Sequence, residues 1–173
     1  YNTTGIELRQ DGSDVVENLT VSDVSVVDNY KHGFAAQGGN RYKNLEFYNV
    51  NMSSNDGEIF NGGPLSDGRG LYIISAPVDN MKVINSSFHD NGLVGLDFNE
   101  PKGVDHNIEI QNVSTSGNGD VGISFHGSND SYVAESTLDD GLDLNGVGNF
   151  TVNKNHLGSG GAVDAVQIQP IVK

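Results

Sequence analysis

Asp97 and His126 are the two side chains of this sequence whose types and spacing could transfer a proton. Carboxylate and imidazole groups often act as general acids and bases in proteins. Asp97 lies within residues 95–98, and His126 directly follows the similar segment 122–125, so the two occupy nearby positions in consecutive copies of one pattern. This spacing predicts an acid and base pair or, as the alternative, a surface hydrogen bond without chemistry.

Asp139, Asp140 and Asp143 form a second group of chemically competent side chains, with Glu135 a few residues before them. Oxygen ligands that lie close together are what Ca²⁺ requires. The spacing matches neither an EF-hand loop nor the tandem nonapeptide of calcium-binding β-rolls. A calcium site at these three aspartates and an ordinary acidic surface therefore both stay open.

Two alternating sequence patterns must position these side chains. The first has the form Asn-apolar-x-apolar and the second the form Gly-apolar-x-apolar, with the period of two that is typical of strands. The first pattern recurs at intervals of roughly 20–35 residues, a period typical of stacked repeats. The second pattern has seven copies, which begin at Gly5, Gly33, Gly70, Gly95, Gly122, Gly141 and Ala165.

This repeat predicts an all-β fold, a single-stranded right-handed parallel β-helix of about seven coils with three short strands in each. One domain covers residues 1–173, and residues 58–69 form a loop that leaves the coil. No coil can bury its apolar side alone, so stability comes from stacking on neighbouring coils. Because no capping helix is expected at either end, we expect flanking domains of the same polypeptide, or a partner, to cover the ends.

The repeated asparagines have a structural explanation. Asn tolerates the left-handed backbone conformation that sharp bends between strands require. When coils stack, equivalent amides can also hydrogen-bond to one another. We expect one ladder of Asn29, Asn55, Asn91 and Asn118, and a second ladder of Asn18, Asn44, Asn80, Asn107 and Asn149.

The same register places a strip of polar side chains with one aromatic ring on one outward face. Coils stack about 4.8 Å apart, so neighbours in a column can contact one extended ligand. Such a strip suits a sugar chain, which can stack on the ring and form hydrogen bonds through its hydroxyls; an ordinary solvated sheet face is the alternative. The strip consists of Tyr72, Asp97, Asn99, Glu100, Ser124, His126, Asp143 and Asn145.

Acidic residues dominate the charge of the chain, with 9 Lys and Arg against 23 Asp and Glu and a net charge of −14. Nucleic acid and anionic membrane surfaces would be repelled, so neither is an expected partner. No stretch has the roughly 18 apolar residues of a membrane span. Cysteine is absent, which excludes disulfides and thiol chemistry. This balance suits a secreted protein, so we expect an extracellular location.

The segment GLDFNE at 95–100, followed by NIEIQNVSTSGNGDVGISF at 107–125, resembles the catalytic modules of mannuronan C5-epimerases, within the pectate-lyase-like β-helix superfamily. The resemblance implies that Asp97 is the catalytic aspartate and Glu100 the family's glutamate. Val94 stands where the family has its catalytic Tyr, and Asn99 where it has its catalytic His. Lys82 is a candidate for the family's lysine by neighbourhood. The implied reaction removes the C5 proton of a uronate while a positive group stabilises the carboxylate.

Three functions therefore compete. The first is a carbohydrate-recognition module of an extracellular polysaccharide-active protein, which binds an extended glycan of the alginate or pectin kind along the outward strip. The second is a catalytic portion of a polysaccharide lyase, epimerase or hydrolase, with Asp97 and His126 as its acid and base. The third is a structural spacer or adhesin stalk.

Overall fold

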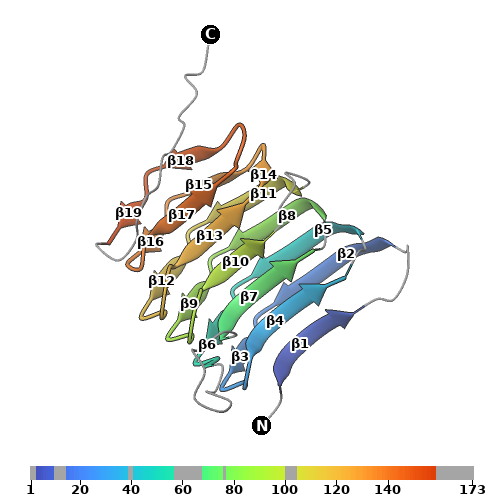
Figure 1. Ribbon diagram of the computed structural model, residues 1–173, viewed down its shortest axis with the longest axis vertical. Coiled ribbons are helices and arrows are strands. Elements are labelled where there is room, and N and C mark those ends of the chain that lie inside the picture. The colour runs from blue at the N-terminus through green and yellow to red at the C-terminus, as the bar shows by residue number, and fades with distance from the viewer. Residues whose placement is uncertain are drawn as a thin grey trace.

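The computed structural model describes residues 3–9, 15–38, 41–56, 68–75, 77–99 and 105–158, and every element in them is a β-strand. Within this part of the chain there is no helix of the length and apolar character that a membrane crossing needs. The strands form three parallel sheets (Figure 1). Sheet A contains β1 (Thr4–Arg9), β4 (His32–Gln37), β7 (Arg69–Ile74), β10 (Leu96–Asn99), β13 (Ile123–His126) and β17 (Leu142–Asn145).

Sheets B and C are built from the strands that follow those of sheet A along the chain. Sheet B contains β2 (Val15–Ser22), β5 (Arg41–Tyr48), β8 (Val78–Ile84), β11 (Asp105–Gln111), β15 (Tyr132–Ala134) and β18 (Thr151–Asn153), and β14 (Ser128–Asn129) pairs with β11. Sheet C contains β3 (Ser25–Val27), β6 (Asn51–Ser53), β9 (Ser87–His89), β12 (Ser114–Ser116), β16 (Thr137–Leu138) and β19 (His156–Leu157).

The order of the strands shows how the chain winds. It visits sheet A, then sheet B, then sheet C, and each sheet pairs a strand with its equivalent from the next turn (Figure 1). Six such coils lie within the described residues. The arrangement is consistent with a parallel β-helix, and the all-β class predicted from the repeat is confirmed. The seventh predicted copy, at Ala165, lies outside the described residues.

The core lies between the three sheets and consists of the inward columns that the alternation predicts. In sheet A, Phe34, Leu71, Leu96 and Ile123 are fully buried in four successive coils. Phe98 and Phe125 stack in neighbouring coils, with ring centroids 4.6 Å apart and planes 7° apart. Each coil therefore presents its apolar side chains to the next, and the core is shared between neighbours.

The glycines of the second pattern are required by the close approach of successive coils. A Cβ atom on Gly70 would lie 2.6 Å from the carbonyl oxygen of Gly95, and one on Gly95 would lie 2.5 Å from that of Gly122. Real Cβ atoms essentially never approach backbone oxygens so closely. Glycine at these starts of sheet A segments is thus a packing requirement.

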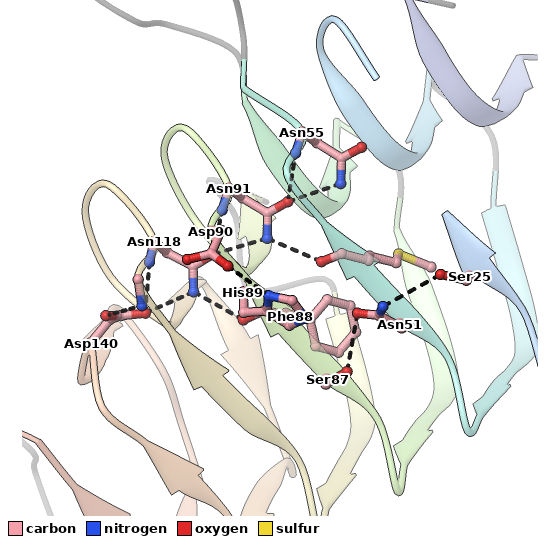
Figure 2. A network of polar contacts seen from close by, with 12 residues as sticks. Ser25, Asn51, Asn55, Ser87, Phe88, His89, Asp90, Asn91, Asn118 and Asp140 are labelled. Atoms are coloured by element: carbon pink, nitrogen blue, oxygen red, sulfur yellow. Dashed lines mark hydrogen bonds and ion pairs between the residues drawn. The ribbon is translucent and has the colours of Figure 1, made fainter. Parts of the chain in front are cut away.

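The first asparagine ladder is confirmed, and it is buried at the bend between sheets C and A (Figure 2). Asn29 Nδ2 donates to Asn55 Oδ1, Asn55 Nδ2 to Asn91 Oδ1, and Asn91 Nδ2 to Asn118 Oδ1, each at 2.9 Å. Asp140 ends the ladder, because its Oδ2 accepts from Asn118 Nδ2 at 2.7 Å. The amide orientation is fixed, since each Nδ2 also donates to a backbone carbonyl.

The left-handed residue at this bend is the one before each ladder asparagine, which corrects the explanation given from the sequence. Asp28, Ser54, Asp90 and Gly117 have positive φ, from 53° to 67°. The ladder asparagines are therefore selected for their amide groups and not for their backbone conformation.

The second predicted ladder is confirmed in part. Asn44 Nδ2 donates to Asn18 Oδ1 at 2.8 Å, and Asn80 Nδ2 donates to Asn44 Oδ1 at 2.7 Å. Asn149 Nδ2 donates instead to Asp130 Oδ1 at 2.9 Å. Asn18, Asn44, Asn80 and Asn107 all have positive φ, as predicted for a bend. They lie inside long strands of sheet B, so they bend a continuous strand where the sequence predicted a bend between strands.

The predicted loop at 58–69 differs from the structure at its last residue. β7 begins at Arg69, so this arginine belongs to sheet A and not to the loop. Residues 58–67 of that loop lie outside the described residues.

Candidate functional site

The outward columns of sheet A have the predicted register. Asp97 pairs with Tyr72 on one side and with Ser124 on the other, and Ser124 pairs with Asp143. Tyr72, Asp97 and Ser124 are buried, at 8%, 4% and 5% exposure, although they point away from the core. The column is therefore a partly enclosed polar row, not an ordinary solvated face.

The second outward column is less enclosed. Asn99 pairs with His126, and His126 pairs with Asn145. Asn99 and His126 are half-buried and Asn145 is exposed. Seven of the eight predicted strip residues thus lie on one outward face, while Glu100 lies outside the described residues.

Asp97 is held by Arg69, a residue that the sequence reasoning missed. Arg69 Nε donates to Asp97 Oδ2 at 2.5 Å, and the two side chains are only 12% and 6% exposed. Arg69 was assigned to the loop because it precedes the Gly-apolar-x-apolar pattern. The signal that could have found it is its position directly before Gly70, which corresponds to Val94 before Gly95 in the next coil.

Tyr72 and His32 complete this cluster. The Arg69 guanidinium carbon lies 4.2 Å from the centroid of the Tyr72 ring, a cation–π contact. The buried ring of His32 lies 5.0 Å from that of Tyr72, with planes tilted by 50°. We call Asp97, Arg69, Tyr72 and His32 the sheet A cluster. It combines a carboxylate, a guanidinium, a phenol and an imidazole from three successive coils.

Burial raises the pKa of Asp97 above its ordinary value. The charge of Arg69 and its hydrogen bond lower this pKa, as does the charge of His126, but these effects do not cancel the loss of hydration. The nearby charge of Asp120 raises it further. Carboxylates with a raised pKa beside a specific charge are common at functional sites.

The structure connects His126 to a different carboxylate from the one predicted. His126 Nε2 lies 3.3 Å from Asp143 Oδ2, and Ser124 Oγ donates to the same oxygen at 3.5 Å. Asp97 bonds to Arg69, so it and His126 are coupled through charge and not by a direct hydrogen bond. Asp97 and His126 therefore lie near each other but have different partners: Asp97 pairs with Arg69, and His126 pairs with Asp143.

A hollow of about 310 Å³ opens beside Tyr72, over the N-terminal coils of sheet A. It lies toward β1 and β4 from the predicted strip, and Tyr72 is the strip residue that lines it. Its polar lining is rich in groups that recognise anions and hydroxyls, namely Glu7, Arg9, Lys31, His32 and Gln37.

The three candidate calcium ligands have separate roles. Asp140 accepts from the backbone N–H groups of Gly117 and Asn118, each at 3.0 Å, in addition to capping the ladder. Asp143 faces His126 in sheet A, while Asp139 lies exposed in the turn before β17. Among the described residues, no group of three or more His, Cys, Asp or Glu side chains is placed to hold a metal ion. The calcium site stays a prediction.

Lys82 lies in β8 of sheet B, where its Nζ is 4.0 Å from Glu46 Oε1. It therefore belongs to a different sheet from Asp97, and Arg69 is the cation that reaches this carboxylate. The suggestion of Lys82 as the positive group beside Asp97 was wrong.

No protein-family model, curated protein or solved structure matches the chain. The class of protein is therefore defined by the fold, three parallel sheets consistent with a parallel β-helix, and by a partly buried polar row on the outward face of sheet A.

Proposed function

We propose that the outward face of sheet A binds an extended acidic glycan, as a recognition module of an extracellular polysaccharide-active protein. The observation that carries the proposal is the hollow beside Tyr72, which combines an aromatic ring with Arg9, Lys31 and hydrogen-bonding side chains. The small exposed part of the Tyr72 side chain offers a sugar a contact at the wall of the hollow, and the cations offer its carboxylate charge-assisted hydrogen bonds.

The distribution of cations supports an acidic ligand in spite of the net charge. The described residues include seven lysines and arginines, of which Arg9, Lys31 and Arg69 belong to the first three coils on the sheet A side. The other four, Arg41, Lys43, Lys82 and Lys154, lie on or next to sheet B. A chain lying along the coils would meet the hollow first and then the second outward column, Asn99, His126 and Asn145.

A titration of the purified chain with alginate, pectin and neutral glucan oligosaccharides tests the proposal. We expect the acidic oligosaccharides to bind more tightly, and Tyr72→Ala to weaken their binding about tenfold. Tyr132→Ala is the matched control, because Tyr132 lies on sheet B away from the hollow. Equal effects of the two substitutions would contradict the proposed face. Failure to bind any glycan would favour the structural spacer.

A second candidate function is proton transfer in a lyase or C5-epimerase reaction. The resemblance to the catalytic modules of mannuronan C5-epimerases, which are right-handed parallel β-helices, implies this chemistry. The sheet A cluster favours it, because a carboxylate with a raised pKa, a guanidinium, a phenol and an imidazole lie together. Arg69 would neutralise the uronate carboxylate, while Tyr72 or His32 would move the C5 proton.

Product analysis separates this second function from binding alone. Turnover would appear as unsaturated sugars or as exchange of the C5 proton with heavy water, and it should be lost in Asp97→Asn and in Tyr72→Phe. Binding without either product would support the recognition module and dismiss the catalytic one.

A further inference from the structure

The described residues contain three Asn-Gly pairs, Asn91-Gly92, Asn118-Gly119 and Asn145-Gly146. This dipeptide is the one most prone to spontaneous deamidation, because glycine offers no side chain to hinder attack by its backbone nitrogen on the asparagine amide carbon. The reaction requires a free side chain and a free backbone N–H, so the surrounding hydrogen bonds decide which pair reacts.

Asn91 and Asn118 are locked on both requirements. Asn91 Oδ1 accepts from Asn55 Nδ2 and its own Nδ2 donates to Asn118 Oδ1, while the N–H of Gly92 donates to the carbonyl of Asn55 at 3.0 Å. Asn118 Nδ2 donates to Asp140 Oδ2, and the N–H of Gly119 donates to the carbonyl of Asn91 at 2.9 Å. Both asparagines are buried, at 2% and 9% exposure.

Within the described residues, Asn145 and Gly146 meet neither restraint. Asn145 ends β17 with an exposed side chain that forms no hydrogen bond within the described residues. Gly146 is also exposed and has a φ of +65°, and its N–H makes no hydrogen bond within the same part of the chain. The carbonyl of Asn145 does accept from the N–H of Gly127, at 2.8 Å, but this contact involves neither the Asn145 side chain nor the Gly146 N–H.

We propose that Asn145-Gly146 is a site of spontaneous deamidation in the folded protein. The Gly146 nitrogen forms a bond to Asn145 Cγ and the Cγ–Nδ2 bond breaks, so that ammonia leaves and a cyclic succinimide remains. Water then opens the ring at either carbonyl and leaves aspartate or isoaspartate. No electrons are transferred, and water is the only co-reactant.

The product changes the face that carries the proposed glycan contacts. Asn145 pairs with His126, whose imidazole already faces Asp143, so the reaction places a second carboxylate beside this pair. An isoaspartate also adds a methylene to the backbone at the end of β17. This modification is independent of the proposed function, because it rests on hydrogen bonding alone.

Peptide mapping by mass spectrometry tests the proposal on the full chain incubated at neutral and mildly alkaline pH. We expect conversion at Asn145 to accelerate with pH and to exceed that at Asn91 and Asn118 by about tenfold or more, because the latter need local opening of the ladder. In concentrated urea the three pairs should convert at similar rates. Asn145→Gln should remove the product at this position.

Two results would overturn the proposal. Conversion of Asn91 or Asn118 in the folded chain as fast as Asn145 would show that the ladder does not protect them. An Asn145 that stays intact in the folded chain while the urea-unfolded chain converts would show that this strand end is restrained.

Discussion

The buried asparagine ladder should be the strongest polar contribution to the stability of the fold, and Asn91→Ala tests it. Asn91 is 2% exposed and its side chain takes part in four hydrogen bonds (Figure 2). Its Oδ1 accepts from the backbone N–H and from Nδ2 of Asn55, at 3.3 and 2.9 Å. Its Nδ2 donates to Asn118 Oδ1 at 2.9 Å and to the Met52 carbonyl at 3.2 Å.

The expected loss follows from this number of bonds. A hydrogen bond contributes a net of about 1 kcal/mol, so four of them contribute about 4 kcal/mol to the free energy of unfolding. Alanine also leaves the amide of Asn55 and the carbonyl oxygen of Asn118 buried without this partner, which adds to the cost. We therefore expect Asn91→Ala to lower the free energy of unfolding by about 3–5 kcal/mol, at the high end for a single substitution.

Urea unfolding followed by circular dichroism measures this loss, as a lower midpoint with an unchanged slope. Asn153→Ala is the matched control: Asn153 is an exposed strand residue of β18, and its substitution should change the stability by no more than about 0.5 kcal/mol. Similar losses for the two variants would refute the reasoning, because a buried amide of the ladder would then contribute no more to the free energy of unfolding than an exposed amide.

Three further predictions concern the carboxylates. Burial raises the pKa of Asp97. The contribution of this carboxyl to stability is therefore fully present below its ordinary pKa and is lost as the pH rises through its raised pKa in the folded chain. In urea unfolding, the stability of Asp97→Asn should increase relative to that of the parent chain from acid to neutral pH. Arg69→Ala leaves this buried carboxylate uncompensated and should lower the free energy of unfolding by about 3–5 kcal/mol, with Arg69→Lys in between. Asp140→Ala removes the acceptor of three N–H groups on Gly117 and Asn118 and should cost about 1–3 kcal/mol, seen as faster amide exchange at these two residues.

The fold could be predicted from the sequence because the repeat encodes it twice. The apolar alternation gives the inward columns, and the recurring Asn and Gly mark equivalent positions in successive coils. The register of Tyr72 with Asp97 and Ser124 therefore follows by counting from each glycine. Stacked repeats make this reliable, since each coil contacts only its neighbours.

The candidate site could be predicted only where it follows the repeat. Arg69 and His32 lie before the glycines, at positions where the repeat has no fixed residue type, so counting columns did not reveal them. The repeat also could not predict the partner of His126. Asp97 and Asp143 both lie one coil away from it, and the conformations of the side chains decide which carboxylate it contacts.

The proposed acidic ligand depends on the charges close to the hollow and not on the net charge of the chain. At physiological ionic strength, charges are screened over about 8 Å, which is less than two coils of a solenoid. Glu7 is the carboxylate among the residues that line the hollow beside Tyr72, and its Oε1 accepts from Arg9 Nε at 2.5 Å. Arg9 and Lys31 outnumber this carboxylate, so we propose that an acidic glycan binds there in spite of the net charge, and we expect its affinity to fall as salt is added.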